Sequence, residues 1–210
     1  MVLVALSMLF VTFLVVANII AVKLVAIGSW VLPVAIIAYP FTFMVTDTIS
    51  EVYGRKTASH VVWLGFAMSL LMTLLVYVGK VIPPADFWGG QDAYSAILGA
   101  VPRIVLGSMV AYVVSQHHDV LAFHLWRRAT SGRFLWLRNN ASTLVSQAVD
   151  TLLFITIAFA GTVPNSVLWN MVGTQYVVKL IIALLDTPLV YGLVGIVRRY
   201  DRTVPPAPDR

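Results

Sequence analysis

Long hydrophobic stretches separated by short polar segments dominate the chain. A helix that crosses a bilayer needs about 20 predominantly apolar residues, so roughly six of these stretches are candidate spans. They cover approximately residues 2–22, 30–47, 58–79, 96–115, 141–160 and 172–197. Pro33 and Pro40 lie in the second stretch and predict a kinked or broken helix there, because each proline removes a backbone donor.

The composition agrees with a membrane location. The chain has 210 residues, of which 60% are hydrophobic and 11% are charged, whereas about 25% of the residues of a soluble domain are charged. We therefore expect an all-α integral membrane protein with a single six-helix domain over residues 1–200 and a disordered cytoplasmic tail over residues 201–210. The sequence contains no cysteine, which excludes a disulfide framework and thiolate chemistry.

The basic residues are distributed unevenly between the two sides of the predicted membrane domain. The formal net charge of +5 could indicate nucleic-acid binding, but most Lys and Arg residues lie in short loops beside apolar spans. One side collects Arg55, Lys56, Arg127, Arg128, Arg133, Arg138, Arg198, Arg199, Arg202 and Arg210. The other side has Lys23 and Lys80, with Arg103 just inside a helix. The positive-inside rule then predicts that both termini are cytoplasmic, and no nucleic acid is expected as a partner.

A few ionisable residues lie inside or at the ends of the apolar stretches. They are Asp47, Glu51, Asp150, Lys179 and Asp186. A charge at membrane depth costs roughly 2.5–3.5 kcal/mol on insertion scales, so it usually marks a pathway or a binding site. In the last span, Tyr176, Lys179 and Asp186 share one helical face, and in the fifth span Gln147 and Asp150 do the same. Asn18 adds an amide in the first span, and Arg103 adds a cation that could bind a carboxylate with two hydrogen bonds.

Two interpretations of these polar groups remain open. They could pair with one another, for example Lys179 with Asp150, and hold the helices together. They could instead form a site for a ligand or an ion, which we favour because four or five helices contribute charged or amide groups. Asp47 and Glu51 lie near the cytoplasmic end and could be solvated. Carboxylates, amides and aromatic rings suit a flat polar ligand with several N–H donors, and a nucleobase fits this description.

Other chemistry receives little support. His117, His118, Asp119 and His124 lie close together but lack the usual helical spacing of metal ligands, so we interpret their segment as an amphipathic interfacial helix. The sequence contains no P-loop motif, and no catalytic motif accompanies the intramembrane acids. We therefore expect a protein that is not an enzyme and has no cofactor and no metal site.

Several sequence blocks resemble a known family. They are Ala17–Asn18, AYPFTFMVTDTISEVYG at 38–54, Arg103, ASTLVSQAVDTLLFITIAF at 141–159 and YVVKLIIALLDTPLVYGL at 176–193. Together they are similar to the YhhQ family of vitamin-uptake transporters, better described as queuosine precursor transporters, from about Val15 to Arg198. The resemblance implies a bacterial inner-membrane protein of six helices, similar in fold to the substrate-binding components of energy-coupling-factor transporters.

The resemblance also implies a function and a set of site residues. The function is uptake of 7-cyano-7-deazaguanine or 7-aminomethyl-7-deazaguanine for queuosine in tRNA. The implied substrate-binding positions are Asn18, Asp47, Arg103, Gln147, Asp150, Tyr176 and Lys179, with Glu51 and Asp186 as less constant members. The alternative function is a substrate-binding subunit of an ATP-driven uptake complex. A homo-oligomer and an ATP-driven partner complex both remain open as partners, besides the small-molecule substrate and membrane lipid.

Overall fold

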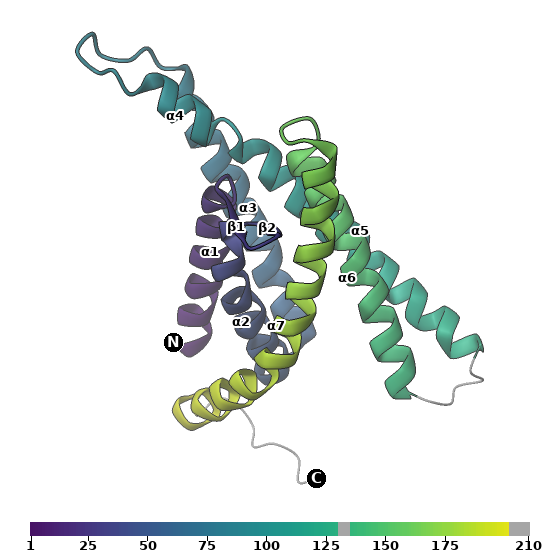
Figure 1. Cartoon of the computed structure of the whole chain (residues 1–210). Helices are drawn as coiled ribbons and strands as arrows, with labels where there is room; N and C mark the ends of the chain where they lie inside the picture. Colours follow the sequence, from purple (N-terminus) through teal and green to yellow (C-terminus); the bar gives the residue numbers. More distant parts are fainter. Residues whose placement is uncertain (130–134, 202–210) are drawn as a thin grey trace. The chain divides into compact units, whose positions relative to one another are not determined.

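The chain is mainly helical, as the sequence predicts. The computed structural model describes residues 1–129 and 135–201, without the side chains of residues 119–143 and of Leu184, Asp186 and Thr187. In chain order, the elements are α1 (Val2–Ile20), β1 (Leu24–Ile27), β2 (Trp30–Pro33), a 3-10 turn (Val34–Ile37), α2 (Tyr39–Tyr53), α3 (Arg55–Val81), α4 (Gln91–Leu98), α5 (Val101–Ala129), α6 (Leu135–Phe159) and α7 (Asn165–Tyr200), as labelled in Figure 1.

These elements form two compact units. Unit 1 contains Met1–Leu24, Pro33–Val101 and the chain from Leu180 onward, and unit 2 contains Val25–Leu32 and Pro102–Lys179. The long helix α7 therefore contributes its first part to unit 2 and its second part to unit 1. The sequence-based expectation of one domain over residues 1–200 stays a prediction.

In unit 1, the helices α1, α2 and α3 pack against one another in pairs (Figure 1). The buried side chains that join them are large and apolar, with Phe10 of α1, Ile49 of α2 and Phe66 of α3 among the most enclosed. Gly65 on α3 allows the close approach of α1, because a Cβ atom there would lie 2.7 Å from the Phe10 ring. Burial of such side chains is the main source of stability for this group of helices.

The second predicted span is interrupted near its prolines, and its first part is not helical. Residues 30–47 do not form one helix: Trp30–Pro33 is a strand paired with Leu24–Ile27, and the next regular helix is α2. Gly28, with φ of 62°, makes the turn between the strands. Pro40 lies in the first turn of α2, where its missing N–H needs no partner. With 15 residues, α2 is about 22 Å long, less than the hydrocarbon thickness of a bilayer.

A side chain of α7 holds this hairpin within unit 2. The Asn170 amide nitrogen donates to the Ser29 carbonyl oxygen at 3.0 Å, and the Val31 backbone N–H donates to the Asn170 side-chain oxygen at 3.0 Å. One amide group thus satisfies a donor and an acceptor of the hairpin. Sequence reasoning missed Asn170 because its role depends on a segment about 140 residues away in the chain.

The predicted count of six spans is not confirmed. In the described part of the chain, four helical segments are long and apolar enough to cross a membrane: Val2–Ile20, Arg55–Val81, Gln91–His118 and Asn165–Ala183. Leu144–Phe159 is a shorter apolar helix. The backbone of α5 also continues as a helix to Ala129, through part of the segment expected to be an interfacial connector.

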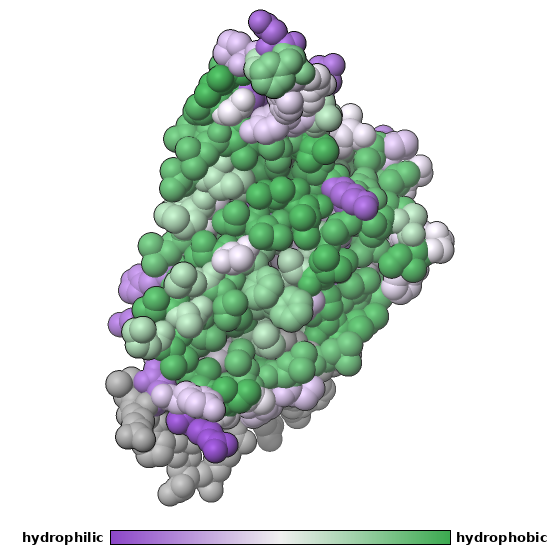
Figure 2. Space-filling model, turned by 90° about the vertical axis from the view of Figure 1, so that its left-hand side faces the viewer, coloured by the Kyte–Doolittle hydropathy of each residue, from purple (hydrophilic) through white to green (hydrophobic). Residues whose placement is uncertain are grey.

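The hydrophobic surface has the character expected of a protein in a lipid environment. Large apolar side chains such as Met8 of α1 and Leu64, Leu71 and Leu75 of α3 are exposed. Figure 2 shows one face on which hydrophobic residues predominate and strongly hydrophilic residues are few. A soluble protein rarely exposes an apolar area of this extent, so the surface supports the membrane location.

Candidate functional site: a buried ion pair

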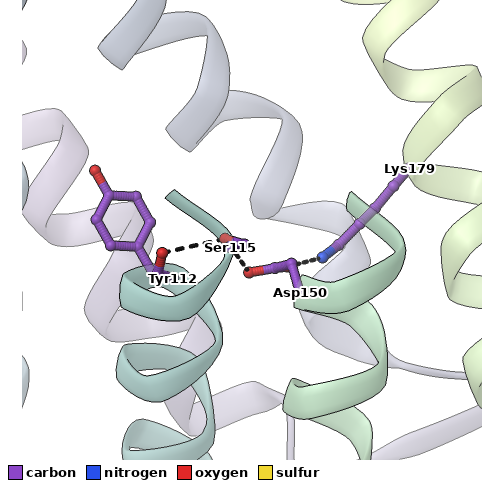
Figure 3. Close-up of polar contacts among 4 residues, drawn as sticks. All are labelled: Tyr112, Ser115, Asp150 and Lys179. Atoms are coloured by element: carbon purple, nitrogen blue, oxygen red, sulfur yellow. Dashed lines mark hydrogen bonds and ion pairs between the residues drawn. The ribbon is translucent and has the colours of Figure 1, made fainter. Parts of the chain in front are cut away.

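Unit 2 contains an ion pair between α6 and α7. The Lys179 Nζ atom lies 2.5 Å from the Asp150 Oδ2 atom, and the two side chains are 6% and 22% exposed (Figure 3). The pairing considered from the sequence is therefore present. An ion pair removed from water is costly unless its geometry is good and further hydrogen bonds complete it, so the surroundings of Asp150 decide what the pair can do.

The polypeptide between α6 and α7 explains why these two residues meet. α6 ends at Phe159, Gly161 turns the chain with φ of 77°, and α7 begins at Asn165. Such a short connection makes the two helices antiparallel neighbours. Their buried positions recur every three or four residues, which is the periodicity of a helix face directed at a neighbour.

A serine from α5 completes the environment of the carboxylate. The Ser115 hydroxyl lies 3.4 Å from the Asp150 Oδ1 atom and 3.1 Å from the Tyr112 carbonyl oxygen (Figure 3). Asp150 therefore contacts a cation on α7 and a hydroxyl on α5. Sequence reasoning missed Ser115. Its signal was the small-residue series Gly107, Ala111 and Ser115, which recurs every four residues and is buried in the structure.

Among the described residues, Arg103 contacts two carbonyl groups, and no carboxylate contact of the kind predicted from the sequence is present. Its Nε atom donates to the Ile157 carbonyl oxygen and its Nη2 atom to the Ala160 carbonyl oxygen, both at 2.5 Å. These acceptors belong to the C-terminal end of α6, where carbonyl groups lack partners within the helix and carry partial negative charge. The guanidinium group therefore caps α6 and fixes its register with the start of α5.

Asn18 lies in unit 1 and is almost fully buried. Its Nδ2 atom donates to the Ser69 hydroxyl oxygen at 3.3 Å, which joins α1 to α3. Its Oδ1 atom is buried and has no hydrogen-bond partner among the residues that the structure describes. The predicted amide in the first span is thus an interior group with acceptor capacity left.

The acids of α2 lie in a more solvated environment. Asp47 and Glu51 are exposed, and the Glu51 Oε1 atom lies 3.5 Å from the Arg198 Nη2 atom of α7. Close by in sequence, the Tyr53 hydroxyl donates to the Asp201 Oδ2 atom at 2.5 Å. Burial, followed by this hydrogen bond and the Asp201 charge, raises the pKa of Tyr53 to about 12. These contacts fasten the end of α7 to the end of α2 within unit 1.

The remaining predicted site residues differ in their contacts and in their burial. The Tyr176 hydroxyl donates to the Leu144 carbonyl oxygen at 3.3 Å, a second contact between α7 and α6. Gln147 is partly buried and lies one helical turn before Asp150. The Asp186 side chain lies outside the described residues. Within the part of the chain that the structure describes, no three His, Asp or Glu side chains form a group able to hold a metal ion.

Comparison with known proteins places these features in a family. The family model described as "Putative vitamin uptake transporter" matches residues 33–193. A Bacillus subtilis protein named "Probable queuosine precursor transporter" is 36% identical over 84% of this chain and 77% of its own length. The Escherichia coli "Queuosine precursor transporter" is 33% identical over 58% of this chain and 52% of its own length.

A third relative, from Haemophilus influenzae, is named "Probable queuosine precursor transporter" and is 26% identical over 75% of this chain and 66% of its own length. No solved structure matches the chain. The family model covers well over half of the 210 residues, and the matched region includes α2 through most of α7 with the Asp150–Lys179 pair. The chain therefore belongs to the vitamin uptake transporter family of multi-pass membrane proteins.

Proposed function

We propose that this chain imports the queuosine precursors 7-cyano-7-deazaguanine and 7-aminomethyl-7-deazaguanine across the bacterial inner membrane, with both termini in the cytoplasm. The observation that carries the proposal is the ion pair between Asp150 and Lys179, held in the interior of unit 2. The names of the relatives support queuosine precursors as the cargo. The comparisons do not favour the alternative of a binding subunit for an ATP-driven complex.

The chemistry of the pair suits a neutral, guanine-like base. A carboxylate offers about four lone-pair positions, and Lys179 and Ser115 occupy two of those on Asp150. The others can accept from the ring N–H and the exocyclic amine of the base. Lys179 balances the charge of Asp150, so the pair is neutral overall and matches the neutral heterocycle of the base. Gln147, on the same helix, then forms a hydrogen bond with the carbonyl edge of the base.

We propose different roles for the other residues implied by the resemblance. Asn18 has a buried acceptor and Tyr176 an aromatic ring for stacking, so both are substrate contacts in the proposal. We assign Arg103 to holding α5 and α6 in register. Asp47 and Asp186 stay proposed substrate contacts, whereas we assign Glu51 to its exposed ion pair with Arg198, and the last prediction below tests this assignment.

The test is uptake of labelled 7-cyano-7-deazaguanine by bacteria that cannot make it and lack their own transporter. Cells that express this chain should accumulate the label and form queuosine in tRNA, and Asp150→Asn should abolish both. Asp92→Asn, in the exposed first turn of α4, is the matched control and should retain uptake. Unchanged uptake in Asp150→Asn would contradict the role of the carboxylate. Uptake by the purified chain in liposomes without ATP would separate the importer from the ATP-driven alternative.

A further inference from the structure

Two buried polar atoms near the ion pair have no hydrogen-bond partner among the described residues. They are the Thr151 Oγ1 atom on α6 and the Gln175 Oε1 atom on α7. Thr151 is 0% exposed and Gln175 is 2% exposed, so bulk water does not replace the missing partners. Leaving a buried polar group unsatisfied is unfavourable, and such groups are rare in folded proteins. Each of these atoms therefore requires an explanation.

Thr151 differs from five other threonines in the described helices of this chain. A helical threonine ordinarily donates its hydroxyl to the carbonyl oxygen one turn earlier. Five threonines of the described helices make this bond to the fourth residue before them: Thr12, Thr46, Thr48, Thr57 and Thr73. Thr151 is more deeply buried than most of these and does not make it. Its hydroxyl is left available to another group.

Both atoms lie at the level of the ion pair. Thr151 follows Asp150 in α6, and Gln175 lies one helical turn before Lys179 in α7. α6 and α7 are antiparallel neighbours joined by the short turn between Phe159 and Asn165. Thr151 lies eight residues before Phe159, and Gln175 lies ten residues after Asn165. Along the helix axes, Thr151 and Gln175 are therefore within about one turn, ~5.4 Å, of each other. Both side chains belong to the buried faces of their helices.

We infer that Thr151 and Gln175 select the substrate by binding its lactam edge. A lactam presents a carbonyl oxygen, which the Thr151 hydroxyl can donate to, beside a ring N–H, which Gln175 Oε1 can accept together with Asp150. This inference rests on the proposed function and adds the reason for choosing a guanine-like base over an adenine-like one. In an adenine-like base an amino group replaces the carbonyl and the ring nitrogen lacks its hydrogen. Neither hydrogen bond can then form with the same donor and acceptor roles.

The test measures how well two competitors inhibit uptake of labelled 7-cyano-7-deazaguanine. One is 7-deazaguanine, and the other is 7-deaza-2,6-diaminopurine, in which an amino group replaces the carbonyl. Thr151→Val keeps the shape of the side chain but loses the hydroxyl, and Gln175→Met keeps the approximate volume but loses the acceptor. Each should weaken inhibition by 7-deazaguanine about tenfold, the effect of losing one hydrogen bond, and leave inhibition by the diaminopurine nearly unchanged.

Two control variants separate this role from a structural one. Thr151→Ser keeps the hydroxyl and should keep the wild-type preference, and Thr73→Val removes a hydroxyl that is already bonded within its helix and should also keep it. An equal loss for both competitors, or an unchanged preference in Thr151→Val and Gln175→Met, would overturn the inference while leaving the importer intact. Absence of uptake by the wild-type chain would overturn the proposed function and this inference with it.

Discussion

An ion pair lies among the described residues of each unit, and the two pairs differ in distance and in exposure. In unit 2, Asp150 and Lys179 are 2.5 Å apart with side chains 22% and 6% exposed. In unit 1, Glu51 and Arg198 are 3.5 Å apart with side chains 60% and 31% exposed. An exposed pair contributes about 0–1 kcal/mol, whereas breaking a buried pair by removing one partner costs about 3–5 kcal/mol. We therefore expect the exposed pair to contribute little to the free energy of unfolding and the loss of one partner of the more buried pair to cost much more.

The surroundings of the two pairs strengthen this contrast. Asp150 also contacts the Ser115 hydroxyl, and two unsatisfied polar atoms lie within about one helical turn of it. Glu51 lies beside the helix ends, where Tyr53 and Asp201 form a further hydrogen bond. Water can replace the contacts around Glu51, whose side chain is 60% exposed, more readily than those around Asp150, whose side chain is 22% exposed. The functional weight of a charged residue thus follows from its access to water.

Removing Lys179 should have the largest effect. Lys179→Met leaves the Asp150 carboxylate in the interior without its cation, so we expect a loss of about 3–5 kcal/mol in the free energy of unfolding and no measurable uptake. Thermal unfolding in detergent and uptake of labelled precursor would measure the two effects. Lys56→Met, an exposed lysine at the start of α3, is the matched control.

A double variant separates stability from function at this pair. Asp150→Asn combined with Lys179→Met removes both charges and should recover most of the lost stability, because a neutral pair does not require compensation. Uptake should stay absent if the carboxylate binds the substrate. Recovery of uptake together with stability would show that the pair only holds α6 and α7 together.

Arg103 comes next. Arg103→Met leaves the carbonyl groups of Ile157 and Ala160 without their charged donor, and hydrogen bonds to charged groups contribute about 1.5–3 kcal/mol each. We expect lower thermal stability with an unchanged preference among substrates. Arg103→Lys should lose less thermal stability, because it keeps the charge although it cannot donate in the same bidentate geometry. A changed substrate preference at unchanged stability would instead make Arg103 a substrate contact.

Gly107 tests how closely α5 must approach α6 to bring Ser115 to Asp150. A Cβ atom at Gly107 would lie 3.3 Å from the Phe154 carbonyl oxygen and 3.4 Å from the Ala158 nitrogen, both backbone atoms. Gly107→Val should therefore lower the free energy of unfolding by about 1–3 kcal/mol and weaken uptake, as measured by thermal unfolding and labelled precursor. Gly173→Val, at a position with open space around the added Cβ, is the control and should have a smaller effect.

The sequence predicts the buried charges better than it predicts their partners. Asp150 and Lys179 stand out because they interrupt apolar helices, and the interhelical pair was among the alternatives considered. Ser115 and the carbonyl partners of Arg103 depend on the register between helices, which no local pattern of residues determines. The close approach at Gly107 follows from the absence of a side chain there. Gln175 and Thr151 were missed because their burial, and not their residue type, makes them unusual.

The hairpin before α2 shows a different limit. Residues 24–37 are almost entirely apolar, and a short apolar run fits a buried helix as well as a strand. Gly28 and Ser29 are the turn signal that divides the run into two strands, and Pro33 ends the second strand. The prediction of a helix over residues 30–47 did not account for this turn. The sequence cannot show that Asn170 supplies the hydrogen bonds that hold the hairpin to α7.

Within unit 1, the hydrogen bond between Tyr53 and Asp201 should have a modest effect that depends on pH. The raised pKa of about 12 means that folding favours the protonated hydroxyl, so its contribution is complete below pH 10 and is lost as pH rises toward 12. Tyr53→Phe should lower the free energy of unfolding by about 1 kcal/mol at neutral pH. It should also reduce the pH dependence of the free energy of unfolding between pH 10 and 12, measured by denaturant unfolding. An unchanged slope in that range would contradict the assignment.

Glu51 should give the smallest effect, and it decides whether the contrast between the units extends to function. Glu51→Gln removes one charge of an exposed pair, so the free energy of unfolding should change by less than about 1 kcal/mol and uptake should stay near the wild-type rate. Arg198→Gln is the matched variant and should behave alike, because it removes the other half of the pair. Loss of uptake in Glu51→Gln alone, at unchanged stability, would instead make this solvated acid a substrate contact. In that case exposure would not separate functional from structural charges in this protein.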